Sequence, residues 1–131
     1  MAEPERGIRA IRGAVQVAAD TREAVGEATR ELIGRLLPAN GLGTADVVSA
    51  FFTATPDLTS ELPVLAASEA GWSAVPMLCA AEMAVPGALP RVVRVMVHAE
   101  MERARPVRHV YLPGTTPDRP APAAPGGNRP G

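Results

Sequence analysis

Residues 91–99 read RVVRVMVHA, and this stretch decides the fold class that the sequence predicts. Its β-branched and apolar residues favour a β-strand. The strand is too apolar to lie at a sheet edge facing water, yet Arg94 stands in its middle. A buried guanidinium without a partner is costly. Arg94 therefore belongs to a structural ion pair, extends its charged end to solvent, or serves a site.

Four further segments have the composition of strands. The segment 47–54 is mostly apolar, so we expect it to be buried on both faces. Pro76 either starts the third strand or places it at a sheet edge, because proline cannot donate to a neighbouring strand. In chain order the four segments are 8–17 (IRAIRGAVQV), 47–54 (VVSAFFTA), 75–80 (VPMLCA) and 107–112 (VRHVYL).

Two helices are expected between the first three strands. Asp20 and Glu23 match a capping box, which makes Asp20 the N-cap of a helix that Pro38 and the Asn40-Gly41 pair end. A second helix covers residues 62–69, with Pro63 in its first turn. The order β-α-β-α-β-β-β predicts an α/β (α+β) protein, with a mixed sheet of about five strands and two main helices on one face.

Composition excludes several function classes. The net charge is −1 and no basic stripe is present, which argues against nucleic-acid binding. Cys79 is the single cysteine, so an intrachain disulfide or a CxxC motif is impossible, and the two histidines lack metal-ligand spacing. We expect no metal, no membrane span, no signal peptide and a cytoplasmic location.

The chain is expected to divide into a folded domain and a tail. Residues 1–112 carry all the predicted elements, and residues 113–131 hold six of the 14 prolines and four of the 12 glycines without periodicity. Such a tail is expected to be flexible. A core of this size is modest, so assembly with other copies would be unsurprising.

Five residues are candidates for chemistry, although each also has an ordinary structural explanation. Arg12 could be an exposed strand residue, Cys79 a small core residue and Glu82 a surface carboxylate. Tyr111 could be a core residue whose hydroxyl is satisfied locally, and Arg94 could form a structural ion pair. None of these signals is specific alone.

Together, these residues occur in segments that resemble the motifs of the trimeric α/β class of chorismate mutases. The resemblance runs from about residue 8 to residue 112, in order and at near-matching spacing. Its motifs are IRGA (11–14), TATPDL (53–58), GW (71–72), VPMLCAAEM (75–83), RVM (94–96) and RHVYL (108–112).

The resemblance implies a homotrimeric pseudo-barrel with active sites between subunits. It also implies the rearrangement of chorismate to prephenate in aromatic amino acid biosynthesis, without nucleophile, metal or cofactor. Such an enzyme can hold a reactive conformer and place fixed charge where charge develops.

The resemblance also assigns roles to residues. Arg94 would donate to the ether oxygen and the side-chain carboxylate, Arg12 would bind that carboxylate, and Glu82 would accept from the ring hydroxyl. Further substrate contacts would come from Tyr111, Cys79, Leu62, Val64, Leu78 and Arg119.

The sequence departs from the family pattern at the mouth of the expected site. Leu62 replaces a frequent aromatic residue, and Leu65 and Ser68 replace a frequent lysine and arginine. Arg119 is a candidate replacement for these cations, or a solvated charge. Two alternatives remain: a non-catalytic trimer that binds chorismate, and an imine-deaminase-like enzyme of the same architecture.

Overall fold

The computed structural model describes residues 4–116. A five-stranded mixed sheet has the order β3-β2-β4-β1-β5, with β4 antiparallel to β1 and β2, and with β3 and β5 parallel to their neighbours. The strands are β1 (Arg6–Gln16), β2 (Val47–Ala54), β3 (Met77–Ala81), β4 (Val92–Glu102) and β5 (Val110–Tyr111). The strand with Arg94 is central, as predicted, and the strand after Pro76 lies at an edge, which is one of the two alternatives that Pro76 left open.

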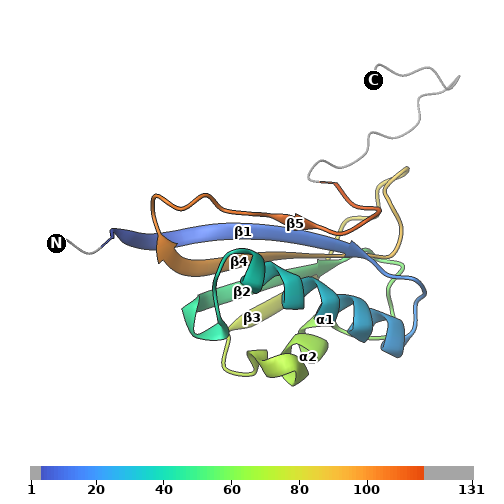
Figure 1. Cartoon of the computed structure of the whole chain (residues 1–131). Coiled ribbons are helices and arrows are strands. Elements are labelled where there is room, and N and C mark those ends of the chain that lie inside the picture. Colours follow the sequence, from blue (N-terminus) through green and yellow to red (C-terminus); the bar gives the residue numbers. More distant parts are fainter. Residues whose placement is uncertain (1–3, 117–131) are drawn as a thin grey trace, which may run out of the picture.

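Both helices cover one face of the sheet, as predicted (Figure 1). Helix α1 (Arg22–Ala39) packs along β1, and α2 (Pro63–Ala67) packs against α1, β2 and β3. A 3₁₀ turn, η1 (Thr44–Asp46), precedes β2, and a π-helical turn, η2 (Ser68–Trp72), follows α2. None of the helices between residues 4 and 116 is long and apolar enough to cross a membrane.

The core lies between the helices and the sheet. Its largest members include Ile11, Leu32, Leu36, Phe52 and Val97. Gly13 lets α1 approach β1 closely, since a Cβ there would meet the Cδ1 atoms of Leu32 and Leu36 at 3.0 Å. This close approach accounts for the glycine within IRGA.

Within residues 4–116, the other face of the sheet carries no helix. We call it the open face. Burial alternates along strand β4. Val95 and Val97 point into the core, whereas Arg94 and Met96 lie on the open face. The prediction that β2 is buried on both faces is wrong, since Phe51 on the open face is 46% exposed. Apolar residues of β2 lie on both the core face and the open face, and composition alone does not tell an exposed apolar face from a buried one.

The start of α1 differs from the prediction. Thr21, not Asp20, is the N-cap, and its side chain accepts from the backbone N–H of Ala24. Asp20 instead accepts from the backbone N–H groups and hydroxyls of Thr59 and Ser60. These four bonds tie the entry of α1 to the loop before α2.

Helix α1 ends where the sequence predicts, since Pro38 lies in its last turn and Asn40 is its C-cap. Two other boundaries differ. The segment 62–69 is split between α2 and η2, where Gly71 has a φ of 102°. The strand expected over 107–112 is shortened to β5. The side chain of Asn40 forms hydrogen bonds with the backbone N–H and C=O of Arg108, so these groups do not pair with a neighbouring strand.

The four bonds to Asp20 predict an acid-dependent loss of stability. They lower the pKa of Asp20 from 3.8 to about 2, the Ser60 hydroxyl contributing most. A carboxyl with a lowered pKa stabilises the fold fully above its unfolded value, and this contribution is lost as the pH falls from 3.8 towards 2. Asp20→Asn should therefore flatten the fall in unfolding free energy between about pH 5 and pH 2.

Urea unfolding at several pH values measures this difference. Glu31→Gln, which changes an exposed carboxylate on α1, is the matched control and should keep the wild-type slope. An Asp20→Asn slope equal to that of the wild type would contradict the role of the four bonds.

Candidate active site

Strand register brings the arginines together on the open face. In one row across the sheet, Arg12 of β1 is opposite Met96 of β4, which is opposite Phe51 of β2. In the next row, Arg94 of β4 is opposite Thr53 of β2. Side chains in neighbouring rows of one face are close enough to share a ligand.

A cavity of about 340 Å³ lies over these rows. It is lined by Arg12, Gly13, Phe51, Thr53, Arg94, Val95, Met96 and Tyr111. Within residues 4–116, the guanidinium of Arg12 and the hydroxyl of Tyr111 have no hydrogen-bond acceptor and no carboxylate partner. The cavity therefore offers donors without acceptors, as a site for an oxygen anion does.

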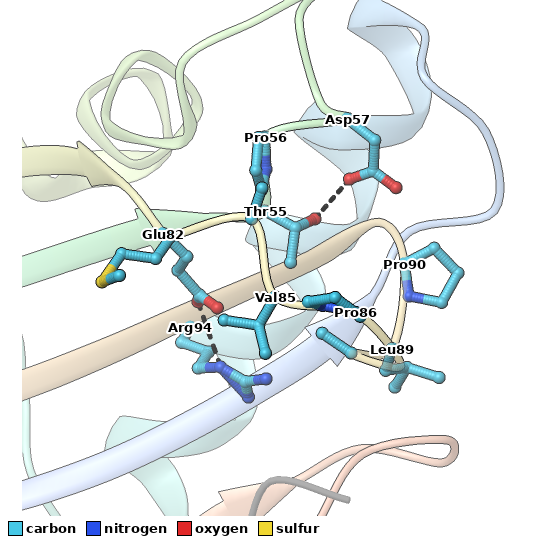
Figure 2. Close-up of a pocket in the computed structure, with 12 residues that line it drawn as sticks. Thr55, Pro56, Asp57, Glu82, Val85, Pro86, Leu89, Pro90 and Arg94 are labelled. Carbon is cyan, nitrogen blue, oxygen red and sulfur yellow. Dashed lines mark hydrogen bonds and ion pairs between the residues drawn. The ribbon is translucent and has the colours of Figure 1, made fainter. Parts of the chain in front are cut away.

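Arg94 is paired through only one of its nitrogens. Its Nε lies 3.0 Å from Oε2 of Glu82, which follows the end of β3 (Figure 2). The same Oε2 accepts from the hydroxyl of Thr53 at 2.7 Å. Glu82 thus fixes the plane of the guanidinium, and both terminal NH₂ groups of Arg94 have no protein partner among the described residues.

A second, larger cavity of about 780 Å³ includes this pair in its lining. Glu82 and Arg94 form one end, and the loop 83–90 and the turn 55–57 form the rest. Its walls are mostly apolar, including Pro56, Val85 and Leu89 (Figure 2). Arg94 therefore lines both cavities, whereas Glu82 lines only the larger one.

His109 holds the strand that carries Tyr111. Its Nδ1 accepts from the backbone N–H of Arg12 at 2.9 Å, beside the short β1–β5 pairing. Desolvation and then the charge of Arg12 lower the pKa of His109, so the neutral, accepting ring is favoured. The imidazole therefore takes the place of a strand carbonyl and keeps Tyr111 beside the cavity.

Other expected site residues lie outside both cavities. Cys79 packs against the core, where burial raises the pKa of its thiol. Leu78 is 64% exposed at the sheet edge. Leu62 precedes α2 and Val64 lies within it, on the helix-covered side of the sheet. In the described part of one chain, these four residues do not join Arg12 and Arg94.

Comparison with known proteins decides the family. Residues 8–121 match the family model described as chorismate mutase type I. The chain is 48% identical to the chorismate mutase AroH of Thermus thermophilus over 108 residues, which cover 80% of this chain and 88% of that one. It is 39% identical to the chorismate mutase AroH of Bacillus subtilis (strain 168) over 107 residues, covering 80% and 84%.

The chain belongs to the type I chorismate mutase family. It is accordingly an isomerase, a chorismate mutase of aromatic amino acid biosynthesis. A solved chorismate mutase from Clostridium thermocellum has the same fold, with a TM-score of 0.77 and 36% identity over 81% of this chain and 96% of that one. The expected family resemblance is confirmed.

Thr53 lines the candidate site and contacts Glu82, but motif reasoning overlooked it. It lies in the TATPDL segment but was given no role. Its contact with Glu82 depends on the pairing of β2 with β4, which places it opposite Arg94. The sequence signal is a hydroxyl on a mostly apolar strand that also carries Ser49, so it becomes informative only once the register is known.

We expect Thr53→Val to reduce kcat/KM for chorismate by about 10-fold to 100-fold. Valine keeps the shape but removes a hydrogen bond to a charged acceptor, worth roughly 1.5–3 kcal/mol. Thr53→Ser keeps the hydroxyl and should stay within about threefold of the wild type. Steady-state kinetics of both variants measure the effect, and equal activity of the valine and serine variants would show that the hydroxyl does not matter.

Proposed function

We propose that this mutase rearranges chorismate to prephenate by fixing the substrate between Arg12, Arg94 and Glu82. The supporting observation is the cavity in which Arg12, Tyr111 and the terminal nitrogens of Arg94 lack protein acceptors. Chorismate supplies a side-chain carboxylate and an ether oxygen as acceptors. The non-catalytic and imine-deaminase-like alternatives lose ground, because the named relatives are chorismate mutases.

Arg94 acts on the bond that breaks. The rearrangement is unimolecular, and the breaking C–O bond leaves negative charge on the ether oxygen. The Nε of Arg94 is held by Glu82, so the two terminal NH₂ groups keep a fixed direction towards the cavity. A donor that is already oriented stabilises developing charge without reorganising during the reaction.

Arg12 and Tyr111 bind the side-chain carboxylate. A planar guanidinium suits a carboxylate geometrically, and the phenol adds a neutral donor. Both residues line the cavity from adjacent strands, β1 and β5. Their role is to hold the side chain over the ring in the reactive conformer.

Glu82 has a second function, to accept from the ring hydroxyl. Arg94 and Thr53 both use Oε2, so Oε1 has no partner within residues 4–116 and remains available. Cys79 and Leu78 border the same hydroxyl from β3. Because the thiol of Cys79 packs on the core, its contribution comes from the backbone at the outer edge of the sheet.

The working enzyme is a homotrimer with shared sites, arranged as a pseudo-barrel. Two observations support this proposal. The open face exposes Phe51, Leu78 and Met96, apolar side chains that assembly would cover. Leu62 and Val64 lie across the sheet from Arg94, so they can reach a substrate there only from a second copy.

The ring carboxylate needs a cation that α2 does not supply, since Leu65 and Ser68 occupy the relevant positions. Arg119 is proposed for this role, but it lies outside the described residues. The division at residue 112, the absence of a cofactor and the cytoplasmic location likewise stay predictions.

Purified protein with chorismate tests the function. Loss of chorismate absorbance and acid conversion of the product to phenylpyruvate should show turnover that EDTA does not change. Arg94→Ala should lower kcat by about 10² to 10³ or more, as loss of an oriented donor at a developing oxyanion does. Arg94→Lys should not restore full activity, because an ammonium lacks the planar fork.

Arg103→Ala is the matched control, since Arg103 is exposed and pairs with Glu5 beyond the end of β4. Its kcat should equal that of the wild type. If the wild type shows no turnover above the uncatalysed rate, the assignment is refuted. A wild type that binds chorismate without converting it would support the non-catalytic alternative. The same preparation should have the mass of three chains by light scattering.

A further inference from the structure

Arg91 has an unusual backbone conformation. Its φ is 53°, in the left-handed region, and it is the only residue other than glycine with a positive φ between residues 4 and 116. Side chains with a Cβ adopt this region reluctantly, so the surroundings must hold it there. Arg91 directly precedes β4, the strand that carries Arg94.

Asp57 holds the backbone of Arg91. Its two carboxylate oxygens accept from the backbone N–H of Arg91 at 3.2 and 3.0 Å. The other contacts of Arg91 join it to the end of β1: its Nε donates to the carbonyl of Val17 at 2.9 Å, and its carbonyl accepts from Val17 N–H at 2.6 Å. Three segments therefore meet at this one residue.

Thr55 links Asp57 to the first residue of β4. Its hydroxyl donates to Oδ1 of Asp57 at 2.5 Å and accepts from the backbone N–H of Val92 at 2.9 Å. Its own N–H donates to the carbonyl of Val92 at 3.0 Å. We call Thr55, Asp57 and Arg91 the β4 clamp.

Two residues of the β4 clamp, Thr55 and Asp57, belong to the lining of the larger cavity, which also contains the ion pair of Glu82 and Arg94 (Figure 2). The loop 83–90 runs from Glu82, whose N–H is bound by the carbonyl of Ala54, to Arg91. The clamp therefore fixes both the far end of this loop and the start of the strand that carries Arg94.

We propose that Asp57 is a positioning residue of the active site, acting through the left-handed backbone of Arg91 on Arg94. This inference rests on the proposed function of Arg94. Without the carboxylate, Arg91 relaxes to a negative φ and the chain enters β4 in another direction. The guanidinium of Arg94, three residues on, then leaves the position in which Glu82 holds it.

Asp57→Ala tests the proposal. A displaced donor loses transition-state stabilisation, so kcat should fall at least about 10-fold while KM stays within about twofold. Asp57→Asn keeps one acceptor oxygen for Arg91 and should fall between Asp57→Ala and the wild type. Asp46→Asn is the matched control, because Asp46 also accepts a backbone N–H in a turn, from Gly43, and directly precedes β2.

A glycine rescue separates positioning from general stability. Glycine adopts a positive φ without support, so Asp57→Ala combined with Arg91→Gly should recover kcat to within about threefold of Arg91→Gly alone. A merely stabilising role for Asp57 would give no such recovery. Unchanged kcat in Asp57→Ala, or a double variant as slow as Asp57→Ala, would overturn the proposal.

NMR of the arginine Nε–H groups gives a reading that does not depend on turnover. The Arg94 signal should shift or broaden in Asp57→Ala and return in the double variant, because it reports the contact with Glu82. An Arg94 signal unchanged in Asp57→Ala would overturn the positioning claim. An inactive wild type with the expected signal changes would instead refute the proposed function.

Discussion

The bond between Nε of Arg94 and Oε2 of Glu82 organises this molecule's chemistry. It joins the central strand β4 to the segment after the edge strand β3, and Thr53 of the strand between them completes it. Arg94 is only partly covered, its side chain being 31% exposed, so water shares in compensating its charge. The pair therefore matters mainly as an orienting contact, which directs the remaining donors of one guanidinium into a cavity.

The sheet that carries Arg94 of this pair has one face covered by helices and one open face. Helices on one face make the sheet rigid through a close-packed core, and the other face, which no helix of the described part of the chain covers, leaves space for a ligand. The antiparallel register of β1 and β4 puts Arg12 in the row of side chains next to that of Arg94. The hydrogen bond between His109 and the backbone of Arg12 keeps β5, and with it Tyr111, beside the same cavity. An enzyme that needs only conformational restriction and fixed charge can be built from these parts without a nucleophile.

Much of this was predictable from the sequence, and the failures have physical causes. The sequence predicts strand β2 with its exact bounds, and an ion pair is one of the three explanations that it allows for Arg94, because an isolated guanidinium in an apolar strand is costly. Thr53 was overlooked because its role depends on strand register. Asp20 was misplaced because capping boxes are common patterns, whereas its true partners, Thr59 and Ser60, are distant in sequence.

A crystal structure of the protein with a stable bicyclic ether dicarboxylate that imitates the transition state tests the central claim most directly. The account predicts three copies around one axis. Each ligand should place a carboxylate between Arg12 and Arg94, its ether oxygen on a terminal nitrogen of Arg94, and its ring beside Leu62 of a second copy. A ligand bound away from Arg94, or enclosed by one copy alone, would contradict it.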